Sequence, residues 1–168
     1  QAKTLFPYTT LFRSTRIQSY TTEIQPPHTL LIRVVERRGI GVVAKGAKLL
    51  VVDAAGVTID TVSVRPSKLP ELIVPSMKDH AFTAVAQTLA ALPLTIRKKV
   101  LSIAAATPDS VQFTLRGTGH RILWGSPDNS ELKALVMERA LRVANRGGGR
   151  AYAIDVSAPD NIVLTPIG

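Results

Sequence analysis

The sequence predicts an α+β fold in which a mainly antiparallel sheet carries two helices on one face. Short β-branched or alternating segments separated by Gly and Pro dominate the chain, and only two stretches have helical spacing. Hairpin-type connections dominate and regular βαβ alternation is absent, which favours antiparallel pairing. With 168 residues, 45% of them hydrophobic and 20% charged, the chain fits one domain, or one domain plus a fragment of another.

The first fourteen residues differ from the rest. The segment QAKTLFPYTTLFRS holds two of the four phenylalanines and has no clear period. Its TLFPYTTLFRS portion resembles translated sequencing-adapter sequence, and the alternative is an ordinary irregular segment. We favour the non-native interpretation, expect the native protein to begin near Thr15, and leave residues 1–14 out of the fold prediction.

Strands are predicted through the first half of the remaining chain. Thr, Tyr and Ile enrichment, β-branched runs and the intervening turns place them at residues 17–24, 30–36, 42–43, 48–53 and 57–64. Pro66 and Pro70 bound a loop.

Two helices and five further strands follow. Residues 79–92 have one apolar face and end at Pro93. A second helix follows the capping candidates of residues 126–130 and runs to about Ala144, with four residues predicted to face inward: Leu132, Leu135, Val136 and Val143. The strands are expected at residues 100–105, 111–116, 121–124, 152–156 and 162–165, with Gly117 to Gly119 as a hairpin turn.

The composition restricts the function classes. The net charge of +9 favours anionic partners and keeps a basic nucleic-acid-binding module as the alternative function. The basic residues form no run of five or more, so a solvated surface is the favoured interpretation. The absence of cysteine excludes disulfides and thiolate chemistry. No apolar stretch approaches the roughly 20 residues of a membrane span.

Catalytic, metal and cofactor sites are not predicted. His28, His80 and His120 lack the spacing of metal ligands. A carboxylate pair from Asp53, Asp60 and Asp155 is a rival enzymatic interpretation, but no local context supports it. The three glycine clusters lack a phosphate-binding fingerprint and are interpreted as turns.

Several motifs in a shared order resemble the extracytoplasmic part of the FtsQ/DivIB bacterial cell-division proteins. They are PPHTL and IRVVER at residues 26–37, LVVDAAGV at 50–57, LPEL at 69–72, the helix ending in Leu92-Pro93, Trp124-Gly125, Lys133 and Ile154-Asp155-Val156. Each motif is weak alone, whereas their order over residues 15–166 is more specific. The chain departs from the family pattern at Gly39, where Pro is usual, at Gly41, where Ala is common, and in lacking the lead-in Trp.

The resemblance implies a domain plan and a location. Residues 15–43 would be the C-terminal part of a truncated POTRA domain, and residues 44–168 the family's β domain. A single membrane-spanning helix would lie upstream, which would put this region on the extracytoplasmic side of the cell membrane at the division septum.

The resemblance also implies a non-enzymatic scaffold that binds other division proteins. The expected partners are bitopic proteins of the FtsB/DivIC and FtsL type, with septal peptidoglycan synthesis proteins as further candidates. A partner segment would add as a strand at the C-terminal edge, within residues 157–165. The candidate contacts are Ser157, Ala158, Asp160, Ile162 and Leu164, and Pro159 shortens the usable edge because it lacks an N–H.

Glu36 and Arg37 form a second candidate surface. They would either recruit another division protein or pair across strands, and cross-strand pairing is favoured.

Overall fold

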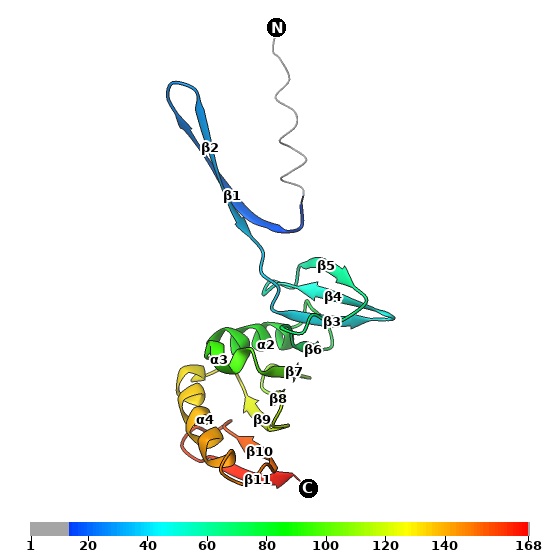
Figure 1. Ribbon diagram of the computed structural model, residues 1–168, viewed down its shortest axis with the longest axis vertical. Helices are drawn as coiled ribbons and strands as arrows, with labels where there is room; N and C mark the ends of the chain where they lie inside the picture. The colour runs from blue at the N-terminus through cyan, green and yellow to red at the C-terminus, as the bar shows by residue number, and fades with distance from the viewer. Residues whose placement is uncertain (1–13, 168) are drawn as a thin grey trace.

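The computed structural model describes residues 14–167 as an α+β protein with two sheets, as predicted (Figure 1). The candidate non-native segment, residues 1–14, lies outside the described residues except for Ser14. The first sheet is a hairpin of β1 (Ile17–Gln25) and β2 (Thr29–Glu36), which projects away from the rest of the molecule. Its strands leave large apolar side chains exposed, among them Ile24, Leu30, Val34 and Val35.

The second sheet has nine strands and supports the core. Along the chain they are β3 (Gly41–Lys45), β4 (Lys48–Val52), β5 (Thr58–Val62), β6 (Glu71–Ile73), β7 (Val100–Ala104), β8 (Val111–Leu115), β9 (Arg121–Gly125), β10 (Ala151–Asp155) and β11 (Val163–Ile167). In space the order is β11-β10-β9-β8-β7-β6-β3-β4-β5. β11 and β5 are therefore the two edges.

Five of the eight strand pairs in this sheet are antiparallel, which confirms the predicted fold class. The pairs β9–β10, β6–β7 and β3–β6 are parallel. Two of these parallel pairs, β6–β7 and β9–β10, enclose βαβ crossovers, which differs from the prediction that hairpin connections dominate. β6 has only three residues, too few to show an alternating pattern, and it follows directly after the loop bounded by Pro66 and Pro70, where no strand was predicted.

Two helices, α2 (His80–Ala91) and α4 (Ser130–Ala144), contact each other and cover the same face of the sheet (Figure 1). Asp79 caps α2 by accepting a hydrogen bond from the Ala81 amide at 2.8 Å. The short helix α3 (Leu94–Arg97) follows Pro93. The core beneath the helices holds Phe113 and Trp124, whose ring centroids lie 5.9 Å apart.

The predicted inward face of α4 is wrong at three of its four residues, since only Val136 packs against the core. Leu132, Leu135 and Val143 are 45%, 47% and 60% exposed, and Val136 is half-buried. The buried face consists of Lys133, Ala134, Met137, Ala140, Leu141 and Ala144. The buried face of α2 also carries alanines, at 81, 84 and 86. The distance between packed helices depends on the side chains at their contact, and the alanines on both buried faces permit a close approach of α2 and α4.

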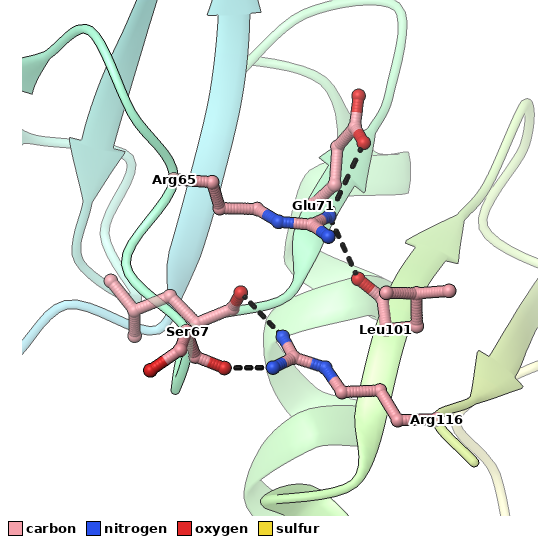
Figure 2. A network of polar contacts seen from close by, with 6 residues as sticks. Arg65, Ser67, Glu71, Leu101 and Arg116 are labelled. Atoms are coloured by element: carbon pink, nitrogen blue, oxygen red, sulfur yellow. Dashed lines mark hydrogen bonds and ion pairs between the residues drawn. The ribbon is translucent and has the colours of Figure 1, made fainter.

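Two arginines hold the connection between β5 and β6 (Figure 2). Arg116, just after β8, donates to the carbonyl oxygens of Ser67 and Leu69. Arg65 lies 3.5 Å from Glu71 and donates to the Leu101 carbonyl of β7 at 3.3 Å. These contacts fasten a Pro-containing segment to the central strands.

The separation between the two sheets lies at residues 37–40. β3, which begins at Gly41, pairs with β4 and β6 and so belongs to the nine-stranded sheet. The predicted boundary at Val43 falls inside this strand. The assignment of residues 15–43 to a POTRA domain stays a prediction.

Candidate partner-binding edge

Among the described strands, β11 pairs with β10 alone, so its other side is a free edge of the nine-stranded sheet. The register places Val163 opposite Asp155, Leu164 opposite Ile154, Thr165 opposite Ala153, Pro166 opposite Tyr152 and Ile167 opposite Ala151.

The neighbours of β10 show which main-chain groups of β11 point outward. The Tyr152 amide donates to Nδ1 of His120, and the Val156 amide donates to the Leu123 carbonyl, both on the β9 side. Because alternate residues of a strand point their main-chain groups to opposite sides, Ala151, Ala153 and Asp155 face β11. Their partners Val163, Thr165 and Ile167 therefore face β10, while Leu164 and Pro166 direct their main-chain groups to the free edge.

Proline restricts this edge at its far end. Leu164 offers an outward N–H and C=O, whereas Pro166 offers only a carbonyl. The sequence alone predicts a restriction at Pro159, whereas the restriction at Pro166 follows from its register with Tyr152.

The side chains of β11 alternate between two environments. Ile162 and Leu164, both predicted contacts, are half-buried and pack against the core. Val163 and Thr165 are exposed on the opposite face, and so is Ile167. The exposed apolar residues of the edge, Val163 and Ile167, were not among the predicted contacts because their orientation depends on the pairing with β10.

The turn before β11 holds the remaining predicted contacts. Ser157 donates through its amide and hydroxyl to Oδ1 of Asp155, at 2.9 and 2.7 Å. The Asn161 amide donates to the Ala158 carbonyl at 3.0 Å. Ser157, Ala158 and Asp160 are exposed. Gly125 has φ of +75°, and a Cβ atom there would lie 3.0 Å from Cβ of Ser157, so the end of β9 packs closely against this turn.

A buried lysine supports the same end of the sheet. Lys133 is 2% exposed, and its ammonium donates to the Ser126 carbonyl at 2.8 Å. Burial lowers its pKa, while the carboxylates of Asp128 and Asp155 act in the opposite direction. Lys133 thus links α4 to the β9–α4 loop near the turn that begins β11.

Arg37 in the second candidate surface is already paired within the chain. Its Nη1 lies 2.6 Å from Oδ2 of Asp53, and Oδ1 of Asp53 accepts from the amides of Ala55 and Val57. This pair joins two different sheets and is not the cross-strand pair that was favoured. Glu36 is exposed and lines, with Arg37, an open cleft of about 790 Å³ between the hairpin and the sheet.

The residues considered for other chemistry lie apart. Asp53 and Asp60 belong to the β4–β5 end of the sheet, whereas Asp155 ends β10, with five strands between β4 and β10. His120 is buried, and its Nε2 lies 3.2 Å from Oδ1 of Asn145. Within residues 14–167, no group of three His, Cys, Asp or Glu side chains has the geometry of a metal site.

Comparison with known proteins finds similar curated sequences. The chain is 31% identical over 162 residues to Cell division protein FtsQ of Streptomyces bingchenggensis, covering 91% of this chain and 59% of that protein. It is 29% identical over 142 residues to the Streptomyces venezuelae protein of the same name, covering 79% and 51%. The protein of that name from Mycobacteroides abscessus is 29% identical over 147 residues, with coverages of 86% and 45%.

Other comparisons add little. The chain spans about half the length of these curated relatives. No known family description matches it. The major extracytoplasmic domain of the cell-division protein DivIB from Geobacillus stearothermophilus aligns with a TM-score of 0.48 and 20% identity, over 68% of this chain and 98% of that one. In the part of the chain that the structure describes, no helix is long and apolar enough to cross a membrane.

Proposed function

This chain is a homologue of the FtsQ cell-division proteins, and on that premise we propose that it is a non-enzymatic scaffold of the bacterial division complex. The observation that carries the proposal is the unpaired side of β11, the edge of a large sheet with a well-packed core. Unpaired main-chain groups of an edge strand accept a strand from another protein, and the added hydrogen bonds supply affinity.

The proposed docking edge is residues 157–167, with Leu164 at its centre. The outward N–H and C=O of Leu164 pair with a partner strand, and the carbonyl of Pro166 accepts one further hydrogen bond. Among side chains, Val163 and Ile167 give specificity on the exposed face, where they are 48% and 39% exposed. The turn before β11 offers three exposed residues to the partner: Ser157, Ala158 and Asp160. The strand itself is held in place because the side chains of Ile162 and Leu164 pack against the core.

The proposed partners are bitopic division proteins of the FtsB/DivIC and FtsL type. We propose that the chain acts outside the membrane, anchored by a helix upstream, and that β1 and β2 are the last strands of a POTRA domain. The exposed apolar side chains of Ile24, Leu30, Val34 and Val35 support the domain assignment, because such a hairpin needs further structure to cover it. If Glu36 recruits another division protein, that protein binds in the cleft beside Glu36, and the ion pair between Arg37 and Asp53 stays intact.

A proline substitution tests strand addition directly. Leu164→Pro removes the outward amide but none of the hydrogen bonds to β10, so the sheet keeps its ladder. Binding to the extracytoplasmic segment of the FtsB/DivIC-type protein of the same genome, measured by titration calorimetry, is expected to fall by about tenfold or more.

The matched control is Leu164→Ala. It loses similar packing against the core but retains the amide, so its affinity is expected to stay within about threefold of the native value. Equal losses in both variants would assign the effect to packing. Unchanged binding in a folded Leu164→Pro variant would place the interface elsewhere.

A further inference from the structure

The solvent-facing side of α4 carries a mixed apolar and basic surface that lies away from β11. Leu132, Leu135, Arg139, Arg142 and Val143 are all exposed, and we call them the α4 outer stripe. Residues 132, 135, 139 and 142 are spaced by three, four and three, which keeps them on one side of a helix. Arg146 continues this spacing just beyond the helix end.

The stripe is unsatisfied within the chain. The three aliphatic side chains are 45–60% exposed, although three of the six residues on the buried face of the same helix are alanines. Neither Arg139 nor Arg142 forms an ion pair with any described residue, since the ion pairs of residues 14–167 involve Arg16, Arg33, Arg37 and Arg65. Leu132 and Leu135 are neighbours on the helix surface, and exposed apolar side chains that lie together typically mark an interaction surface.

We propose that the α4 outer stripe binds an acidic amphipathic helix of a partner protein. Residues with three-four spacing form the line of contact along which two helices pack side by side. In the α4 outer stripe, Leu132 and Leu135 form the N-terminal half of this line. The arginines form the second half and match carboxylates, with which guanidinium groups make charge-assisted hydrogen bonds. A helix of about 15 residues, roughly 22 Å long, covers the stripe.

The pattern distinguishes this occupant from two others. If two copies packed stripe on stripe, the stripe itself would place no carboxylate opposite the arginines, because its five residues are all aliphatic or basic. On helices that lie in a membrane surface, basic residues occupy a polar face opposite the apolar one. Viewed along the helix axis, Arg139 lies between Leu132 and Leu135, at the middle of the stripe. If the two leucines inserted into an anionic bilayer, Arg139 would have to be buried with them.

The test uses the full chain and a fluorescent three-heptad peptide. The peptide carries Leu at the positions facing Leu132 and Leu135, and Glu at those facing Arg139 and Arg142. Binding is followed by anisotropy at 0.15 M salt. Leu135→Ser and Arg142→Glu are each expected to weaken binding by about tenfold or more. Both positions are exposed, so the variants are expected to fold, and circular dichroism is the measurement that checks this.

Arg150→Glu is the matched control, because it makes the same charge change at an exposed residue outside α4. Its affinity is expected to stay within about twofold. A peptide with Lys in place of Glu is expected to regain binding to the double variant Arg139→Glu, Arg142→Glu. Equal losses in Arg150→Glu and Arg142→Glu would overturn the proposal, as would absence of peptide binding. Preferential binding of phosphatidylglycerol vesicles, lost in Arg142→Glu, would assign the stripe to a membrane instead.

Discussion

Arg37 and Asp53 join the two sheets through a contact of 2.6 Å between Nη1 and Oδ2. Arg37 directly follows β2, and Asp53 directly follows β4. Asp53 also accepts the amides of Ala55 and Val57 and is 6% exposed, so the same carboxylate shapes the β4–β5 turn and fixes the hairpin. Asp53 therefore has two structural roles, one in the β4–β5 turn and one in positioning the first sheet.

Replacing Asp53 tests this double role. Asp53→Ala is expected to lower the free energy of unfolding by about 3 kcal/mol, because it removes two amide acceptors and leaves Arg37 partly buried without its partner. Asp53→Asn retains an acceptor for the amides and should lose about half as much. Urea denaturation measures both values, and a loss below about 1 kcal/mol for Asp53→Ala would contradict the assigned role.

Lys133 should make stability depend on pH in the alkaline range. Burial lowers the pKa of this lysine from its ordinary 10.5. The unfolded chain therefore binds the proton more tightly, and the free energy of unfolding rises with pH between the lowered pKa and 10.5. Below the lowered pKa the full penalty for burying the charge is present.

Lys133→Met isolates this effect. The variant should lack the alkaline rise seen in the native chain, and the difference between their two stability curves cancels other titrations. Near neutral pH its stability should lie within about 1 kcal/mol of native, because losing the buried charge offsets the lost bond to Ser126. Parallel curves for the two proteins up to pH 10.5 would exclude the effect.

Gly41 should not tolerate a side chain. A Cβ atom there would lie 2.5 Å from Cδ2 of Leu72 and 2.9 Å from the carbonyl oxygen of Pro70. Gly41→Ala is expected to cost about 1–3 kcal/mol, although Ala is common at this position in the resembled family. Gly46→Ala is the comparison, since no atom lies within 4 Å and only its φ of +59° opposes the change, at about 1 kcal/mol. Thermal unfolding that ranks Gly46→Ala as the more harmful variant would refute this account.

The alternative of nucleic-acid binding makes a different prediction from the scaffold function. With a charge of +9, weak association with DNA at low salt is expected from counterion release alone. At about 0.15 M salt we expect no retained complex in a gel shift, because the basic residues are dispersed. A complex that survives there and discriminates between sequences would support the alternative.

The sequence could predict most elements but not how they meet. Turn residues and alternating hydrophobicity located the strands of the β1–β2 and β8–β9 hairpins. The predicted first helix began at Asp79, which is the residue that caps α2. The orientation of α4 was not predictable, because Leu132 and Leu141 are equally apolar and only the packing of α4 against α2 and β10 decides which of them is buried. Similarly, Leu164 and Val163 alternate in the sequence, but pairing with β10 decides which of them points to the core.

The three-residue strand β6 makes the large sheet two units joined by a narrow seam. On one side, β7 to β11 pair in succession, and on the other, β3 to β5 do the same. Between β3 and β6 the ladder contains one pair, Val42 with Glu71, and the bond from the Val42 amide to the Pro70 carbonyl at 2.9 Å belongs to this pair. Any pulling force applied between the β1–β2 hairpin and the β11 edge must cross this seam. It should therefore yield first under load, and faster hydrogen exchange at Val42 than at Ile103 or Phe113 would reveal that mechanical weak point.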